Sequence, residues 1–432
     1  MDAHENRMLA ECGPGTSGGA VLRNYWQPAA LTEELGGARP VLPVTLLGEE
    51  LVLFRNQLGD LGLVQRSCPH RGVDLAFGRL EEGGLRCPFH GWLFDVDGNC
   101  LETPAEPATS TFHTKVRIGC YSVVERNGIV WAWMGAGDPP PLPGFDCFVA
   151  PPTHVFAFKG MWECNWFQAQ EVGIDPAHAA FLHRYEELDD EQYGQQFRAM
   201  VADTGVSVVK LMREVPAATI TAEATDYGFR LRALRDYHGR FTHVRVSNSI
   251  FPNAIAIAMS PTMTIMQWHV PIDDVRCYWY SMFVSYTEPV DAATLRAQRI
   301  DRVELPTYRS VTGRATSWGY DPIEQQEATY TGMGYDINVH DQWAVESPRP
   351  ISDRTREHLS PSDVGIRLHR RMFLEAAKTP TPETLIGTAN RDALRGPAAV
   401  DSAATDDDFD GAWRRFDSSR RLASGWAPPL TN

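Results

Sequence analysis

Short runs of apolar residues dominate positions 40–137 and predict a small all-β domain. The dipeptide Asp97-Gly98 separates two of these runs, and Asn127-Gly128 separates two others. Asp-Gly and Asn-Gly between apolar runs are strong hairpin signals, because both turn positions need positive φ angles. We therefore expect β-hairpins at these two places.

A proline-rich stretch follows this region. The sequence Asp-Pro-Pro-Pro-Leu-Pro-Gly at 138–144 cannot continue a helix or a central strand, so it predicts a boundary between domains. Beyond it, strand-like and helical patterns are mixed, which predicts an α+β domain built on an antiparallel sheet. The patterns indicate strands within 204–286 and helices within 162–186, 338–347 and 362–377.

These patterns divide the chain into five segments. The tail contains many Pro, Ala and Asp residues, including three consecutive aspartates at 406–408, and we expect it to be irregular. The first residues are also expected to be irregular, apart from a helical turn. The segments are an N-terminal segment over 1–25, the all-β domain over 26–138, a linker over 139–150, the α+β domain over 151–380 and the tail over 381–432.

Composition narrows the functional classes. The chain has 432 residues, of which 43% are hydrophobic and 22% charged, so it can bury a core and is not a disordered protein. Its net charge of −15 argues against nucleic acid as the main partner. No apolar run approaches the roughly 18–20 residues of a membrane span, and the polar start has no secretory pattern. We expect a cytoplasmic protein without a membrane partner, whose eight scattered cysteines form no disulfide framework.

Two cysteines and two histidines form the first candidate metal site. Cys68 and His70 give the spacing C-x-H. After sixteen intervening residues, Cys87 and His90 give C-x-x-H. One interpretation is a structural zinc ion in a tetrahedral Cys₂His₂ site. The other is a [2Fe–2S] cluster of the Rieske type, with the cysteines on one iron and the histidines on the other. The tight C-x-H spacing favours the cluster.

A second constellation lies within 164–185. Glu171, Asp175, His178 and His183 follow one another with the spacing E-x₃-D-x₂-H-x₄-H. On an ideal helix, Asp175 and His178 lie about 60° apart, whereas His178 and His183 lie about 140° apart. Both histidines can reach one ion only if the helix breaks between them. Two histidines and one carboxylate form the site of mononuclear non-haem iron oxygenases, and an amphipathic helix with two incidental histidines is the alternative.

The first motif resembles that of Rieske proteins over about residues 40–137. Rieske proteins of the cytochrome bc type carry two further cysteines and a serine near the cluster. This chain has Val73, Phe89 and Trp92 at those places. The resemblance therefore points to the oxygenase or ferredoxin branch, and the missing hydroxyl removes a hydrogen bond that would raise the cluster potential.

With both motifs, residues 20–380 resemble the α subunits of Rieske aromatic ring-hydroxylating oxygenases, in particular the branch similar to phthalate 4,5-dioxygenase. The resemblance implies a helix-grip-like catalytic domain with a mononuclear Fe(II) on His178, His183 and a downstream aspartate. Asp336, Asp341, Asp353 and Asp363 are candidates. We choose Asp341, because the segment 340–347 matches the ligand helix best.

The same resemblance assigns roles to other residues. It implies a head-to-tail homotrimer, or a hexamer of two trimers, in which His90 of one subunit hydrogen-bonds Asp175 of the next. Asp175 in turn bonds His178 and bridges the two metal centres, although a carboxylate that only stabilises a helix start is the alternative. Glu171 and Asn165 are expected to support the site.

The implied function is that of an oxygenase component that uses O₂ to hydroxylate an aromatic carboxylate similar to phthalate or benzoate. Electrons would come from a separate flavin/[2Fe–2S] reductase or a ferredoxin. NAD(P)H would bind to that reductase, because this chain has no Gly-rich dinucleotide motif. The alternatives are an O-demethylase of methoxylated aromatic acids with the same iron chemistry, an electron-transfer Rieske protein and a zinc-stabilised binding module.

A carboxylate substrate calls for a cationic anchor in an apolar pocket. Four arginines lie on strands and loops that the pattern brings near the site, although each is by default a surface or ion-pair residue. Residues 251–253 and Met259 are candidates for the pocket wall, with ordinary core packing as the alternative. The four arginines are Arg198, Arg235, Arg240 and Arg245.

Overall fold

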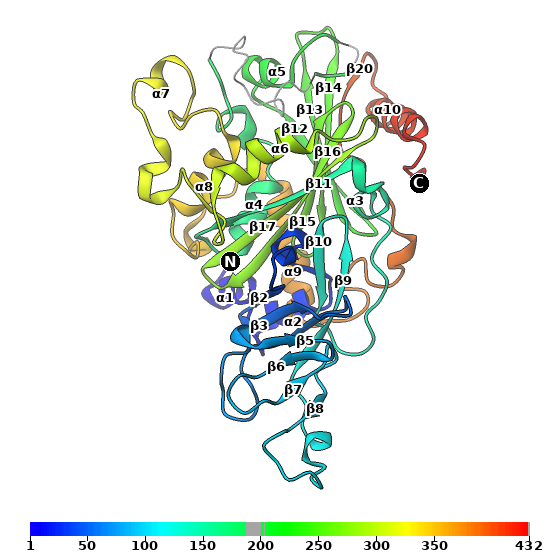
Figure 1. Ribbon diagram of the computed structural model, residues 1–432. Helices are drawn as coiled ribbons and strands as arrows, with labels where there is room; N and C mark the ends of the chain where they lie inside the picture. The colour runs from blue at the N-terminus through cyan, green and yellow to red at the C-terminus, as the bar shows by residue number, and fades with distance from the viewer. Residues whose placement is uncertain (187–199, 203, 431–432) are drawn as a thin grey trace.

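The computed structural model describes residues 1–186, 200–202 and 204–430, and its N-terminal part contains two antiparallel sheets (Figure 1). The larger sheet has the order β1 (Gln27–Leu31), β10 (Ile129–Trp133), β9 (Cys120–Arg126), β4 (Leu61–Gln65), β3 (Glu49–Arg55) and β2 (Val41–Leu46). The smaller sheet has the order β5 (Arg79–Glu81), β6 (Gly84–Arg86), β7 (Leu93–Phe94) and β8 (Cys100–Glu102).

Both expected hairpins form. The Asp97-Gly98 turn joins β7 to β8, and Gly98 has a φ of 77°. The Asn127-Gly128 turn joins β9 to β10, with φ angles of 47° and 85°. These angles lie in the left-handed region, which explains why Asn and Gly occupy the second turn.

A ten-stranded sheet forms the centre of the second part. Its strands pair antiparallel except for β11 with β19, and helices α4 (Trp166–Gly173) and α9 (Val364–Lys378) pack against it. The predicted α+β class is therefore confirmed. In order, the strands are β12 (Thr219–Thr225), β13 (Gly228–Asp236), β14 (Thr242–Ile250), β15 (Ala254–Ser260), β16 (Met263–Asp273), β17 (Arg276–Ser285), β11 (Val155–Trp162), β19 (Arg309–Ser310) and β18 (Val303–Glu304), while β20 (Val400–Ala404) pairs with β14.

Two expectations about local structure were wrong. The N-terminal segment contains two helices, α1 (Ala3–Ala10) and α2 (Ser17–Arg23), which pack against α9. The region expected to contain strands includes one helix, α5 (Val208–Glu214). All three helices begin at a side-chain cap that satisfies free backbone N–H groups, and the caps are Asp2, Thr16 and Ser207.

The expectation of an irregular C-terminal tail was also wrong. The tail contributes strand β20 and the 16-residue helix α10 (Phe409–Ser424). The acidic run ends at Asp408, whose side chain accepts a hydrogen bond from the Gly411 N–H and caps α10. Trp413 is buried in a cluster with β14 and β20. An amphipathic face and a cap thus outweigh the Pro- and Asp-rich composition.

The N-terminal sheet and the large sheet share one hydrophobic core. Trp131 on β10 packs edge-to-face against Trp268 on β16, with ring centroids 4.9 Å apart. Lys159 on β11 is buried and forms an ion pair of 2.7 Å with Glu34, which precedes β2. The two parts of the chain are therefore packed as one body. Throughout the described ranges, every helix is too short or too polar to cross a bilayer.

Candidate metal centres

Two loops with the same backbone geometry carry the predicted cluster residues. In the first loop, the Cys68 N–H donates to the Val73 carbonyl at 2.9 Å, and the Gly72 N–H donates to the Cys68 carbonyl at 2.8 Å. In the second loop, Cys87, Gly91 and Trp92 repeat both bonds, at 2.8 and 3.0 Å. Gly72 and Gly91 each have a φ of 76°, a conformation that glycine adopts without strain. The shared Cys-Pro-x-x-Gly pattern thus produces a matched pair of loops.

The side chains of the two loops face one another. The rings of His70 and His90 lie 4.4 Å apart between centroids, and Trp92 stacks on His70 at 4.3 Å. Burial, together with the neighbouring Cys87, raises the pKa of the Cys68 thiol to about 11. A thiolate here therefore needs a positive charge beside it, which a bound metal supplies.

The spacing of these side chains distinguishes between the two metal hypotheses. A single tetrahedral zinc ion would hold its S and N ligands about 3.4–3.8 Å apart. Within the described part of the chain, only one set of three candidate ligand atoms lies within 4.8 Å of one another, and it consists of His178, His183 and Asp341. The two cysteines and two histidines are thus spread more widely, as a two-iron cluster requires.

The second candidate centre begins where α4 ends. α4 stops at Gly173, and His178 starts a short 3-10 turn over His178–Ala180. The 3-10 turn ends before His183, so the two histidines do not lie on one continuous helix, as their spacing predicts. It turns His178 toward His183, with ring centroids 5.1 Å apart.

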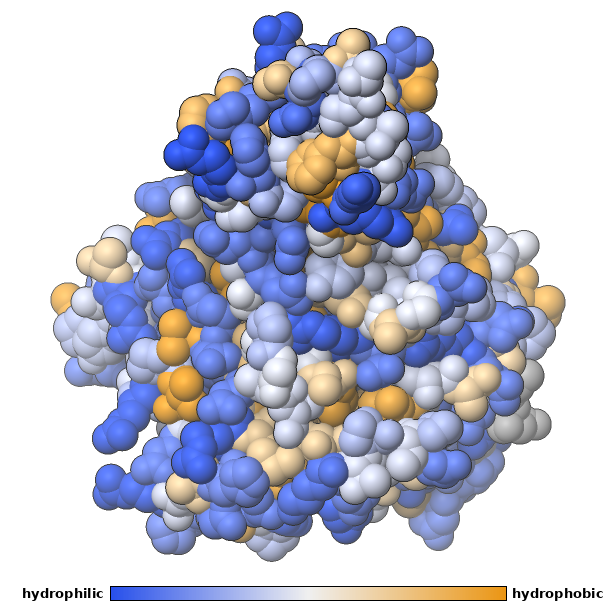
Figure 2. Space-filling view, turned by 90° about the horizontal axis from the view of Figure 1, so that it is seen from below, coloured by the Kyte–Doolittle hydropathy of each residue, from blue (hydrophilic) through white to orange (hydrophobic). Residues whose placement is uncertain are grey.

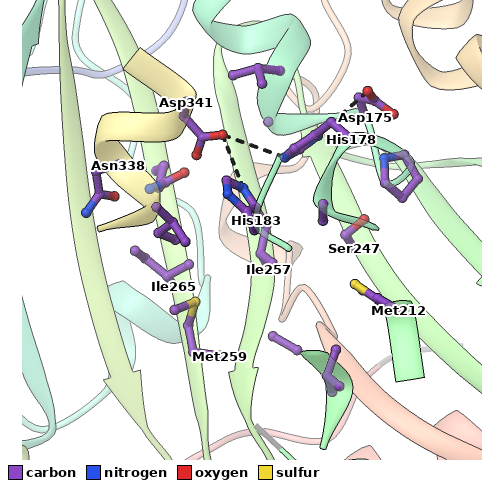
Figure 3. Close-up of a pocket in the computed structure, with 18 of the residues that line it drawn as sticks. Asp175, His178, His183, Met212, Ser247, Ile257, Met259, Ile265, Asn338 and Asp341 are labelled. Carbon is purple, nitrogen blue, oxygen red and sulfur yellow. Dashed lines mark ion pairs between the residues drawn. The ribbon is translucent and has the colours of Figure 1, made fainter. Parts of the chain in front are cut away.

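Helix α8 (Ile337–Glu346) supplies the carboxylate (Figure 3). Asp341 Oδ1 lies 3.3 Å from His183 Nε2 and 3.7 Å from His178 Nε2. This oxygen is buried and accepts no hydrogen bond. Three donor atoms that converge around a buried, unpartnered carboxylate oxygen fit a metal ion of the two-histidine, one-carboxylate type.

Electrostatics keeps this carboxylate charged. Burial by itself would raise the pKa of Asp341, but His183 and His178 outweigh that effect and lower it. Burial lowers the pKa of His183, so this imidazole is neutral at pH 7. An anionic oxygen beside a neutral imidazole is the protonation state that metal binding requires.

His340, one residue before Asp341, determines which nitrogen of His183 faces the site. His340 Nε2 donates to the Gly334 carbonyl at 2.9 Å, and burial lowers the pKa of this ring to about 4. The neutral His340 therefore presents Nδ1 as an acceptor, 3.4 Å from His183 Nδ1. His183 then carries its proton on Nδ1 and leaves the Nε2 lone pair toward Asp341. Sequence reasoning did not assign this role to His340.

Asp175 lies on the far side of His178 from Asp341 (Figure 3). Its Oδ2 is 3.7 Å from His178 Nδ1, and its Oδ1 accepts a hydrogen bond from the Ala177 N–H at 2.7 Å. Burial opposes ionisation, but His178 and nearby backbone N–H groups lower the pKa of Asp175. The carboxylate is thus ionised and lies beside His178.

The other two predicted supporting residues stabilise the fold instead. Glu171 is buried and forms ion pairs with Arg354 at 2.8 Å and Arg370 at 2.5 Å. Asn165 caps α4, and its amide donates to the carbonyls of Ala10 and Asp274. Neither lines the cavity that holds the His178–Asp341 group. The alternatives to Asp341 lie elsewhere: Asp336 caps α8, Asp353 caps a 3-10 turn and Asp363 bonds Ser360.

A cavity of about 1280 Å³, part of it open to solvent, lies beside His178, His183 and Asp341. Its walls are largely apolar and include Ile257, Met259 and Ile265 (Figure 3). We call it the iron pocket. Met259 therefore lines the pocket as expected, whereas residues 251–253 line a different cavity.

Only one of the four proposed arginine anchors lines the iron pocket. Arg245 reaches it from β14, held by an ion pair of 2.6 Å with Asp401, and Asp401 also contacts the buried His243 at 2.8 Å. Arg235 is buried and donates to the Pro176 carbonyl, while Arg240 packs over the Tyr237 ring. Arg198 lies outside the described residues.

Three further arginines, Arg184, Arg213 and Arg299, line the pocket and were missed by sequence reasoning. Arg184 forms an ion pair of 2.9 Å with Glu186. Among the described residues, Arg213 on α5 donates to the backbone carbonyls of Tyr185 and Glu186, and no described carboxylate lies within 4 Å of it. Arg299 packs over the rings of Phe158 and Phe283. No local signal marks Arg213, because α5 was expected to be a strand.

Comparisons with known proteins support this description. Residues 25–113 match the Rieske [2Fe-2S] domain family, and residues 132–425 match the family described as LigXa C-terminal domain like. The chain is 32% identical to the phthalate 4,5-dioxygenase oxygenase subunit of Pseudomonas putida, over 90% of each chain. It is 31% identical to the tert-butanol monooxygenase / tert-amyl alcohol desaturase oxygenase subunit of Aquincola tertiaricarbonis, over 88% of this chain and 78% of that protein.

Solved structures have the same fold. The NdmA QL mutant from Pseudomonas putida CBB5 with theobromine superposes with a TM-score of 0.57 at 18% identity. The match covers 86% of this chain and 96% of that one. With both domain families matched in order and relatives above 30% identity over most of its length, the chain belongs to the Rieske-type oxygenases, as an oxygenase subunit of the group that includes phthalate 4,5-dioxygenase.

Proposed function

We propose that this oxygenase hydroxylates an aromatic carboxylate held in the iron pocket. One observation carries the proposal: the three convergent side chains of His178, His183 and Asp341 open into a largely apolar cavity that also contains arginines. An apolar cavity with a few fixed cationic groups suits a flat ring with an acid group.

His178, His183 and Asp341 would hold a ferrous ion. Bound there, the ion supplies the binding and reductive activation of O₂ that side chains alone cannot provide. The chain contributes the protonation states: a charged Asp341, and a neutral His183 oriented by His340. The three ligands leave room on the pocket side for the substrate and O₂.

The walls of the pocket position the substrate. Ile257, Met259 and Ile265 enclose a ring by apolar contact. The Arg245 guanidinium is fixed by Asp401, so it can bind a carboxylate with little loss of side-chain entropy. Arg213 adds a charge that no described carboxylate neutralises, and therefore favours an anionic substrate.

A second subunit would complete the site. In Figure 1 the sheet of β5 to β8, which carries the cluster loops, lies at the bottom, whereas α4 and α8 lie in the upper half. A separate hollow lies beside His178 on the outer surface, lined by Phe181, Trp318 and Tyr330 among others. We call it the surface hollow. We propose that it receives the cluster end of a neighbouring subunit in a homotrimer or hexamer, with His90 of that subunit hydrogen-bonded to Asp175.

The cluster end has the side chains for such a contact. Phe77, Phe89 and Phe112 are exposed there, and Phe89 packs on His90 with ring centroids 4.0 Å apart. The underside of the molecule shows hydrophobic patches interspersed with polar ones, rather than one continuous apolar face (Figure 2). Such a mixture is typical of specific protein–protein interfaces. A separate reductase that uses NAD(P)H, or a ferredoxin, would supply the electrons.

Asp175→Asn tests the bridging role. The variant keeps a similar volume but loses the charge that orients His178, so we expect unchanged iron content and slower reoxidation of the reduced protein by O₂ and substrate. Stopped-flow absorption in a single turnover measures the rate. A rate equal to that of the unmodified protein would remove Asp175 from the bridge.

The substrate is tested by a screen of O₂ uptake. The purified protein with a surrogate reductase is supplied with phthalates, halobenzoates and methoxybenzoates, and the products are identified by mass spectrometry. We expect coupled O₂ uptake with acids and little with the matching amides, because Arg213 and Arg245 favour an anion. Release of formaldehyde from a methoxybenzoate would identify an O-demethylase, and equal activity on the amides would contradict the carboxylate anchor.

A further inference from the structure

A second cavity lies where the N-terminal sheet meets the large sheet. It encloses about 540 Å³ of space between the side chains, part of it open to solvent. It shares no lining residue with the iron pocket. We call it the junction cavity, and its walls include Tyr25, Trp131, Phe148, Phe251, Trp268 and Arg391.

Aromatic rings form most of its wall. Trp131 packs edge-to-face on both Phe148 and Trp268, with centroids 4.9 Å apart in each pair. Tyr25 and Phe251 make a similar contact at 5.7 Å. Rings fixed in this way offer both faces and edges to a further planar ring.

Arg391 is the one charged side chain that lines the junction cavity. It is only 8% exposed, its Nη2 donates to the Asn24 carbonyl at 2.6 Å, and its Nη1 has no hydrogen-bond partner among the described residues. No described carboxylate lies within 4 Å of it, although its guanidinium packs over Trp133 at 4.8 Å. A buried charge without a counter-ion is costly, and burial lowers the pKa of this group accordingly.

The other buried arginines show how unusual it is for a buried guanidinium to lack a carboxylate partner. Among the described residues that are similarly buried, five form ion pairs, and Arg235 alone shares the lack of a carboxylate with Arg391. Arg235 lines neither cavity. Of the two buried arginines without a carboxylate partner, Arg391 is therefore the one that lines an aromatic cavity. The five paired residues are Arg299, Arg354, Arg370, Arg420 and Arg421.

We propose that the junction cavity binds a small aromatic carboxylate, with the carboxylate on Arg391 Nη1 and the ring among the tryptophan and phenylalanine side chains. This site is separate from the iron pocket and does not depend on which substrate the iron pocket takes. Its wall combines the N-terminal sheet, the large sheet and the segment around Arg391, so a bound ligand joins three parts of the chain. Binding to the folded state alone would raise the melting temperature.

Crystals of the holoenzyme with 4-bromobenzoate test the location directly. Anomalous scattering from bromine should show a peak in the junction cavity of the unmodified protein. The peak should disappear in Arg391→Gln and persist in Arg395→Gln, a matched control four residues away whose side chain bonds backbone carbonyls. A peak in the iron pocket, where present, should be the same in all three, so failure of this site is distinguishable from failure of the proposed function.

Titration calorimetry tests whether the charges of the ligand and of Arg391 contribute to binding. Benzoate should bind the junction cavity at least tenfold more tightly than benzamide in the unmodified protein, and Arg391→Gln should remove this difference. Ile386→Trp fills the cavity but keeps Arg391, so it should abolish the binding of both benzoate and benzamide. This variant replaces Arg391→Gln in the test if Arg391→Gln does not fold. Absence of bromine from the cavity at saturation, or its retention in Arg391→Gln, would overturn the proposal.

Discussion

At the scale of single residues, the hydrogen bond between His340 and His183 controls the second centre. We expect His340→Phe to weaken iron binding by about 10- to 100-fold, because His183 loses the acceptor that fixes its tautomer. Iron titration of the apoprotein measures the affinity. His358→Phe is the control, since His358 is exposed and remote from this hydrogen bond, and it should bind iron normally. Equal affinities for the two variants would disprove the role of His340.

Asp341 is the residue on which the second centre depends most. Asp341→Ala removes the one carboxylate of the triad, so we expect the iron content to fall from about three to about two per chain, with loss of turnover. The red-brown absorption of the cluster should remain. Asp353→Ala removes the cap of a 3-10 turn in the same part of the chain and should change neither the iron content nor the turnover. Full turnover by Asp341→Ala would reject the ligand assignment.

The individual site residues were predictable to different degrees. The four cluster residues were readable from the sequence, because each loop is closed by hydrogen bonds within six consecutive residues. The place of Asp341 rested on resemblance, since it is 158 positions from His183 and no local pattern joins them. The ion pairs of Glu171 could not be predicted, because a carboxylate near two histidines does not reveal that two distant arginines will pair with it.

At the scale of elements, helix α10 is anchored by one buried ion-pair group. Arg421 contacts Asp146 and Asp417, each at 2.6 Å, and all three side chains are buried. Arg421→Met leaves the buried Asp146 without its cationic partner, whereas Asp417 keeps Arg420, so we expect a loss of about 3–5 kcal/mol in the free energy of unfolding. Urea denaturation measures it. Arg415→Met on the same helix breaks an exposed pair and should change stability little.

The hairpins and the C-terminal helix show what the sequence reveals about elements. The two hairpins were predictable because their turn residues need positive φ angles, a purely local property. Helix α10 was missed because composition was weighed above its cap at Asp408 and its buried Trp413. The burial that stabilises α10 comes from β14 and β20, which no local window contains.

At the scale of the whole molecule, the surface hollow predicts an assembly. Tyr330→Asp places a charge in this apolar hollow beside His178, so we expect it to convert the trimer or hexamer into monomers. Analytical ultracentrifugation measures the mass, and iron analysis should show that both centres are retained. Leu422→Asp, at a highly exposed position on α10, should leave the assembly intact. A monomeric unmodified protein would contradict the predicted assembly.

The way in which the two sheets meet was beyond the reach of the sequence. Periodicity shows that β10 and β16 have apolar faces, but it does not say which faces touch. The prolines at 139–143 suggested separable domains, whereas Trp131 and Trp268 lie in one continuous core. The junction cavity arises from the same contact and was therefore not foreseeable.

The Trp131–Trp268 contact also limits how such an enzyme can be recombined. A chimera that exchanges residues 26–138 for those of a relative would place a foreign surface against Trp268, and the mismatch would leave a void or a clash of the kind that destabilises cores. Such a chimera should fold when strand β16 of the same relative is exchanged together with residues 26–138. Evolution faces the same restriction, so new reductase partners are more easily acquired by changing the exposed loops at the cluster end than by exchanging the whole module.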